Sequence, residues 1–184
     1  MGEKKTVSWT AEEVLYLTGT QSVFLNAGIT MMTGYADVVF SNGKESFNYT
    51  FEVVSTYSEG LFFSTGSSTT FTKYTKTFPE DATQKDIIDS YEGIFQTESF
   101  GISIGELLSA GGGKTYAVDP ATKQIDLTGW LGTSYTYSAG VGSPVFSVSL
   151  GAQITAYRAP NKASSNFSNH PEWFYNMSYG VKEK

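Results

Sequence analysis

The sequence predicts an all-β protein whose strands form an antiparallel meander closed as a barrel, with a two-sheet sandwich as the alternative. Apolar residues alternate with polar ones over many short runs, turn signals recur at hairpin spacing, and no internal repeat has a fixed period. About nine strands and one or two short helices are expected. The length of 184 residues, 40% of them hydrophobic, suits one β-rich domain over residues 1–184, with 160–184 as a loop-like segment packed on it.

The first element, residues 10–18, fits two structures. Thr10 and Glu13 have the spacing of a capping box ahead of Val14, and Gly19 is placed as a C-terminal stop. These signals predict a short helix, although the run VLYLT supports a strand almost as well. Both structures stay open at this point.

A hairpin is expected next, with one strand before and one after Asn42-Gly43, because Asn-Gly between alternating runs is the strongest short hairpin signal. In its second strand, residues 45–54, alternate positions carry Phe47, Tyr49, Phe51 and Val53. This pattern predicts a half-buried strand. Further strands follow over residues 61–65 and 69–78.

The second helix is predicted after Pro79. Asp81 and Gln84 have capping-box spacing, and Lys85 sits four residues before Asp89, which favours an ion pair along one helix face. Ile87, Ile88 and Tyr91 form the expected buried edge.

The next strand covers residues 93–106 and is expected to end at Gly111-Gly112-Gly113. Residues 114–118 then pair with 123–127 across a turn that contains Pro120. Residues 146–156 give the clearest strand, because one face is wholly apolar and the other is nearly wholly polar.

The stretch 93–151 has an unusual composition, with eleven Gly but only two Lys and four acidic residues. A long, weakly charged sheet would aggregate through exposed edges, so this part is predicted to be closed, covered or paired with another chain. Oligomerisation through it is one of the expectations.

Charge and composition exclude several classes of function. The 12 basic residues include one Arg, Arg158, and the net charge is −6, which disfavours nucleic-acid binding. No stretch is apolar enough for a membrane helix, and residues 1–10 lack the apolar core of a signal peptide. The chain has no Cys, which removes disulfides and suits an extracellular or cell-surface location.

Catalytic motifs are weak. Residues 111–115 end like a phosphate-binding loop, but the first glycine of that motif is replaced by Leu108 and strand residues follow. His170 is the one imidazole and lies in a loop by composition. Glu98 and Glu106 remain formal candidates for a carboxylate-dependent glycoside hydrolase. No catalytic residue, metal ligand or cofactor is assigned.

Aromatic side chains offer the other route to function, because they stack on sugar rings and form interface hot spots. The candidate binding residues are Trp130, Tyr135, Tyr137, Trp173 and Tyr175.

The favoured function is a non-enzymatic, secreted or surface-displayed module that binds a glycan, a protein or an apolar small ligand. It would use an aromatic and hydroxyl-rich β surface or cavity. A membrane-active or pore-forming barrel is the first alternative, suggested by residues 146–156, although the mean hydropathy of −0.20 suits a soluble monomer. The glycoside hydrolase is the second alternative.

Overall fold

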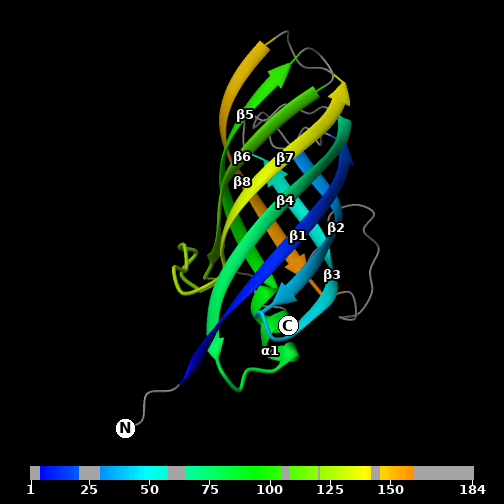
Figure 1. Ribbon diagram of the computed structural model, residues 1–184. Coiled ribbons are helices and arrows are strands. Elements are labelled where there is room, and N and C mark those ends of the chain that lie inside the picture. Colours follow the sequence, from blue (N-terminus) through cyan, green and yellow to red (C-terminus); the bar gives the residue numbers. More distant parts are fainter. Residues whose placement is uncertain are drawn as a thin grey trace, which may run out of the picture.

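The computed structural model describes residues 5–20, 30–57, 65–104, 108–119, 121–141 and 146–159. Within them the chain forms a closed antiparallel barrel of eight strands and one helix, with the helix at one end (Figure 1). The strands are β1 (Thr6–Thr20), β2 (Thr30–Ser41), β3 (Ser46–Tyr57), β4 (Thr65–Pro79), β5 (Gly93–Ile104), β6 (Leu108–Val118), β7 (Leu131–Val141) and β8 (Phe146–Arg158), and the helix is α1 (Gln84–Tyr91). The all-β class and the closed barrel are confirmed.

The strand order around the barrel is β1-β2-β3-β8-β5-β6-β7-β4, which is not that of a simple meander. In each half of the chain three strands pair in sequence and the fourth returns to the first, so that β4 pairs with β1 and β8 pairs with β5. This is the Greek-key order, and it occurs twice. The halves join where β3 pairs with β8 and β4 pairs with β7. The repeat lies in the connectivity, so it leaves no periodic trace in the sequence.

The N-terminal element is a strand along its whole length, so the helix predicted over residues 10–18 is wrong. β1 pairs with β2 on one side and with β4 on the other. Trp9, Ala11, Leu15 and Leu17 are buried at alternate positions, which is the period of a strand. Pairing with two neighbours outweighed the local capping signal.

The predicted helix after Pro79 is present, but it begins later than its first capping signal indicated. Thr83 is the N-cap residue: its hydroxyl accepts a hydrogen bond from the Asp86 backbone N–H, and the Asp86 carboxylate accepts one from the Thr83 backbone N–H. This capping box replaces the one predicted between Asp81 and Gln84.

The helix buries the side that the sequence predicted. Ile87 and Tyr91 are fully buried, and Ile88 packs against the core. Lys85 and Asp89 form the expected ion pair on the exposed side. The helix therefore inserts its last turn into one end of the barrel, here called the helix end (Figure 1).

The turn at Asn42-Gly43 joins β2 to β3, as predicted. Gly43 has a φ of +83°, which favours glycine. The connection spans residues 42–45 because the Asn42 Oδ1 accepts hydrogen bonds from the backbone N–H groups of Lys44 and Glu45. It is thus a four-residue loop closed by the asparagine side chain.

Two predictions in the second half are wrong in detail. Gly111-Gly112-Gly113 does not end a strand but lies inside β6, paired with both β5 and β7. Residues 114–118 and 123–127 share one bridge, between Val118 and Ile125, because β6 takes its ladder partner from β7 instead.

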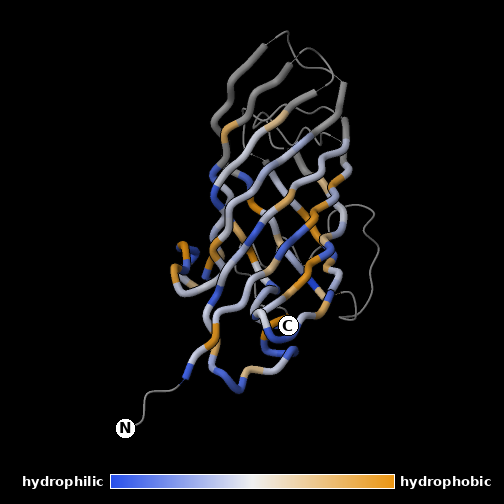
Figure 2. The backbone as a smooth tube through the Cα atoms, in the orientation of Figure 1, coloured by the Kyte–Doolittle hydropathy of each residue, from blue (hydrophilic) through white to orange (hydrophobic). Residues whose placement is uncertain are grey.

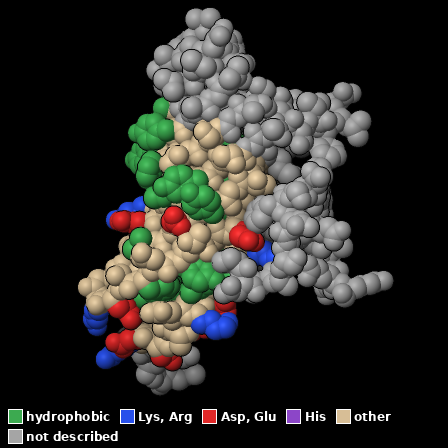
Figure 3. All heavy atoms as spheres, turned by 90° about the vertical axis from the view of Figure 1, so that its right-hand side faces the viewer, with side chains coloured by type: hydrophobic (Ala, Val, Ile, Leu, Met, Phe, Trp, Pro, Cys, Tyr) green, Lys and Arg blue, Asp and Glu red, His purple; other side chains and the backbone are tan. Residues whose placement is uncertain are grey.

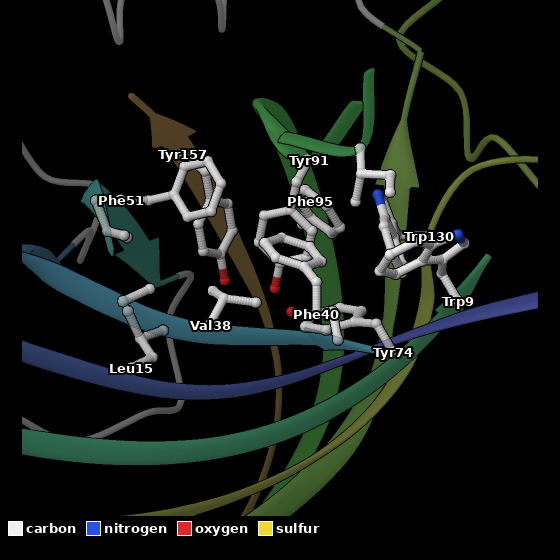
Figure 4. Close-up of a cluster of buried hydrophobic side chains, with 14 of the residues drawn as sticks. Trp9, Leu15, Val38, Phe40, Phe51, Tyr74, Tyr91, Phe95, Trp130 and Tyr157 are labelled. Atoms are coloured by element: carbon white, nitrogen blue, oxygen red, sulfur yellow. The ribbon is translucent and has the colours of Figure 1, made fainter. Parts of the chain in front are cut away.

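The barrel interior near the helix end is filled by aromatic rings. Tyr91 from α1 lies among the rings of Phe40, Phe51, Tyr74, Phe95, Trp130 and Tyr157, with ring centroids 5.1 to 5.5 Å from its own (Figure 4). The Trp130 indole N–H donates to the Ser90 hydroxyl. An eight-stranded barrel is just wide enough for side chains to fill, and here they do so.

Farther from the helix end the interior is lined by hydroxyl groups that bond across neighbouring strands. Thr97 and Thr115 are 2.9 Å apart at their hydroxyl oxygens, and the Gln153 amide donates to the Ser55 hydroxyl at 2.7 Å. The polar face of β8 is therefore the inner one, while Ile154 on its apolar face is exposed outside. Figure 2 shows the alternation of hydropathy along the strands.

Replacement of Gly132 by Ala is expected to destabilise the protein by about 1–3 kcal/mol, because a Cβ there would overpack the interior. That atom would lie 2.5 Å from Cδ1 of Tyr74, a ring that is buried against Tyr91 and Phe95 and has no room to move. Urea unfolding measures the change. Thr133→Ala, at an exposed neighbouring position, is the matched control, and an equal loss in both variants would contradict the packing argument.

Candidate functional site

The candidate site is a group of exposed aromatic side chains on the outer wall of the barrel. Its members are 37% to 61% exposed. They come from β1, β2, β4, β5 and β7, five of six neighbouring strands. We call this group the aromatic belt: Tyr16, Tyr35, Phe71, Phe100, Tyr135 and Tyr137.

Strand register brings the belt together. Tyr16 pairs with Tyr35 across β1 and β2, and their ring centroids are 5.0 Å apart. Phe71 pairs with Tyr135 across β4 and β7 and makes an edge contact with the ring of Tyr137 at 6.5 Å. Cross-strand aromatic pairs of this kind stabilise a sheet by a few tenths to about 1 kcal/mol.

Between Tyr135 and Phe100 the belt crosses β6 at a glycine. Gly112 pairs with Tyr135 on one side and with Phe100 on the other. A Cβ at Gly112 would lie 3.6 Å from Cδ1 of Tyr135 and 3.9 Å from Cε1 of Phe100, so both rings border the glycine backbone. Because Gly112 has no side chain, the outer surface is recessed at this residue, with an aromatic ring on each side.

Charged residues follow the belt residues two to four positions farther along the strands towards the helix end. Lys73 and Glu12 pair in register, and the Lys73 Nζ lies 2.9 Å from the Glu12 Oε1. Lys114 and Glu98 pair in register across β6 and β5. Asp37 is likewise exposed, two positions from Tyr35 on β2. We call these five exposed residues the charged row; it holds two positive and three negative charges. On the face drawn in Figure 3, hydrophobic side chains gather on the upper described part, and further ones lie lower, among the charged side chains.

The structure divides the sequence-predicted site residues. Tyr135 and Tyr137 lie in the belt, whereas Trp130 is fully buried in the aromatic interior and cannot present its ring at the surface. Trp173 and Tyr175 lie outside the described residues, as do His170 and Glu106. Glu98, a formal candidate for the glycoside hydrolase, is exposed in the charged row.

The sequence argument missed four belt residues, Tyr16, Tyr35, Phe71 and Phe100. Tyr16 lies between the buried Leu15 and Leu17, and Phe71 between the buried Thr70 and Thr72, so alternation alone could have placed both on the outer face. What alternation could not supply was their common level on the wall, which depends on register between strands that are distant in sequence.

The interior holds a second unusual group, Glu13, which is the one buried acidic residue among those described. The Tyr91 hydroxyl donates to its Oε2 at 3.0 Å, while its Oε1 has no hydrogen-bond partner in the described part of the chain. Alternation in β1 demands an apolar residue at this position, between Ala11 and Leu15. An acidic residue at a position where the alternation predicts an apolar one is the sequence signal that could have identified Glu13.

Burial raises the pKa of Glu13 to about 7, because the charged form loses its hydration. Hydrogen bonding to Tyr157, Tyr91 and other hydroxyls opposes this shift without cancelling it. Near neutral pH the side chain therefore exists in both protonation states.

The described residues contain no cluster of three potential metal-ligating side chains, and they contain no helix long and apolar enough to cross a bilayer. Fold and surface define a closed double Greek-key barrel with an exposed aromatic belt. No family model, curated protein or solved structure matches this chain.

Proposed function

We propose that the protein is a non-enzymatic interaction module that binds its partner through the aromatic belt. The observation that carries this proposal is the contiguity of six exposed aromatic side chains over neighbouring strands. Contiguous apolar patches on a soluble surface mark interaction sites, and Tyr offers a large contact area with few rotatable bonds. Binding of this kind needs no reacting group.

The sheet itself supplies the rigidity that such a surface needs. The belt residues stand on strands whose backbone groups pair on both sides in a closed barrel. Rings fixed on rigid elements lose little entropy on binding. A glycan, a protein or an apolar ligand stays the predicted partner class, and the secreted or surface-displayed location also stays a prediction.

The proposal predicts that belt tyrosines respond to a partner and core tyrosines do not. With 3-fluorotyrosine incorporated, we expect the fluorine signals of Tyr135 and Tyr137 to shift in titrations with either an oligosaccharide panel or phospholipid vesicles. The signals of the buried Tyr74 and Tyr157 serve as internal controls. Single Tyr→Phe variants assign the resonances.

Two results would contradict the proposal. If the belt signals stay fixed with every probe, or move only together with the core signals, the belt is not a binding surface. Leu127, which is 72% exposed in the loop before β7, provides a control outside the belt. Loss of the response in Tyr135→Ala but not in Leu127→Ala localises it.

A second candidate, a membrane-active protein, is favoured by one observation: the strand segments on the far side of the belt from the helix end contain no Lys, Arg, Asp or Glu. The interior at the helix end is filled by rings, which does not favour an open pore.

A further inference from the structure

Two lines of residues cross the outer wall at right angles to the strands, with one residue of each line on β5, β6, β7 and β4. The strand register defines both lines, because each residue pairs with the next one on the neighbouring strand. We call the first the aromatic line: Phe100, Gly112, Tyr135 and Phe71. The second, the polar line, lies two residues farther along every strand: Glu98, Lys114, Thr133 and Lys73. All four side chains of the polar line are exposed.

We infer that the partner of the belt is an uncharged, extended oligosaccharide, which lies along the aromatic line with hydroxyl groups directed at the polar line. This inference rests on the proposed function and names its partner. The sugar rings would stack on the aromatic side chains, and no covalent step is involved.

The aromatic line suits stacking on successive sugar rings. Phe71, Tyr135 and Phe100 stand on three of four neighbouring strands. Strands lie about 4.8 Å apart, so the line spans roughly 14 Å at the backbone, about the length of three pyranose units. Gly112 places no side chain between Tyr135 and Phe100, so their rings border one continuous surface. The C–H faces of pyranose rings are apolar and pack on such rings.

The polar line presents both hydrogen-bond donors and acceptors. Lys114 faces Glu98 in register, and Lys73 forms an ion pair with Glu12 of β1 at 2.9 Å. Since each lysine has an acid beside it, the line presents little net charge to a partner. A sugar hydroxyl can donate to the carboxylates and accept from the ammonium groups, which a purely cationic or anionic group cannot do.

The curvature of the wall favours a flexible chain over a globular partner. The four strands make up half of the barrel, so the rings at the two ends of the aromatic line point away from each other. A flat protein surface would contact the middle of the line and miss its ends. An oligosaccharide can follow the curve by rotation about its glycosidic bonds.

The first experiment titrates the full chain with neutral hexasaccharides: cellohexaose, xylohexaose, laminarihexaose and maltohexaose. Calorimetry and the fluorine signal of Tyr135 report binding. At least one hexasaccharide should bind, with no loss of affinity at high sodium chloride, because the sugar carries no charge. The matching disaccharide should bind about ten-fold more weakly or worse, since it can cover no more than two rings.

Alanine variants of the aromatic line locate the site. Phe71→Ala and Tyr135→Ala should each weaken binding about ten-fold, because one stacked ring is lost. The two side chains are 46% and 61% exposed, so their removal leaves the core intact. Leu127→Ala, outside the belt, should leave the affinity unchanged. Circular dichroism and thermal unfolding verify that the variants fold.

Variants of Lys114 test the polar line and stay informative if a ring variant unfolds. Lys114→Gln keeps a hydrogen-bond donor without the charge, so its affinity should stay within about two-fold of that of the parent protein. Lys114→Met has no donor and should bind about five-fold more weakly.

Three results would overturn the inference: no binding of any hexasaccharide, an affinity that is unchanged in both ring variants, or equal losses in Lys114→Gln and Lys114→Met with weaker binding at high salt. The last result would identify a charged partner, such as a peptide. If vesicles shift the belt fluorine signals and no sugar does, the sugar inference fails and the proposed function stands. If no probe shifts them, both fail.

Discussion

Glu13→Gln is expected to stabilise the protein by about 3 kcal/mol at pH 8 and by far less at pH 4. The pKa of this carboxyl is about 7 in the folded protein, against an ordinary value of 4.5 for a glutamic acid in water. Between these two values the folded state holds a proton that the unfolded state has lost. Stability therefore falls as pH rises from about 4.5 to 7, and the full cost of burying the charge is present above pH 7.

The measurement is the free energy of unfolding in urea for the parent protein and the variant at pH 4, 6 and 8. Other carboxyl groups affect both proteins equally, so the difference isolates Glu13. Glu12→Gln is the matched control, because the neighbouring side chain lies exposed on the outer wall. A stability difference that stays constant with pH would show that Glu13 is not the buried, protonated acid described here.

Tyr91→Ala is expected to cost about 3–5 kcal/mol, the range for removing a large buried aromatic side chain. Six rings lie within 5.1 to 5.5 Å of the Tyr91 ring centroid, and α1 delivers it to the centre of the cluster. Truncation would leave a cavity and remove the hydrogen-bond donor of Glu13. Tyr137→Ala, on the exposed belt, should change stability by no more than about 0.5 kcal/mol.

Tyr91→Phe separates packing from hydrogen bonding. It keeps the ring and removes only the hydroxyl, so the loss should be well below that of Tyr91→Ala. Combined with Glu13→Gln in a double-mutant cycle, it measures the coupling between the two side chains. Equal losses for Tyr91→Ala and Tyr91→Phe would mean that the ring contacts contribute little, contrary to the packing seen in Figure 4.

Much of the fold could be predicted because it depends on local patterns. The alternation in residues 146–156 predicted β8, and the Asn42-Gly43 signal predicted the β2–β3 hairpin. It is harder to predict which face of each strand points into the barrel. The sequence of a strand alternates with a period of two whether its apolar face points into the barrel or outward. The alternation in β8 therefore did not indicate which face was the inner one.

The candidate site was only half predictable for a related reason. Tyr135 and Tyr137 are adjacent in one strand and could be chosen from the sequence, whereas Phe71 and Tyr16 join them through pairings across β7, β4 and β1. The return of β4 and β8 to the first strand of each half has no local signal at all. Burial of Trp130 likewise depends on α1 reaching into the barrel from elsewhere in the chain.

The doubled Greek key suggests two units that could stand apart, but the interior shows otherwise. Of the six rings around Tyr91, three belong to the first half and three to the second half, where Trp130 lies in the connection between β6 and β7: Phe40, Phe51 and Tyr74, then Phe95, Trp130 and Tyr157. The linker between the halves supplies the residue on which both converge. Neither half has a hydrophobic core of its own. A fragment made by cutting the chain at α1 would therefore have to bind the other half before it could fold.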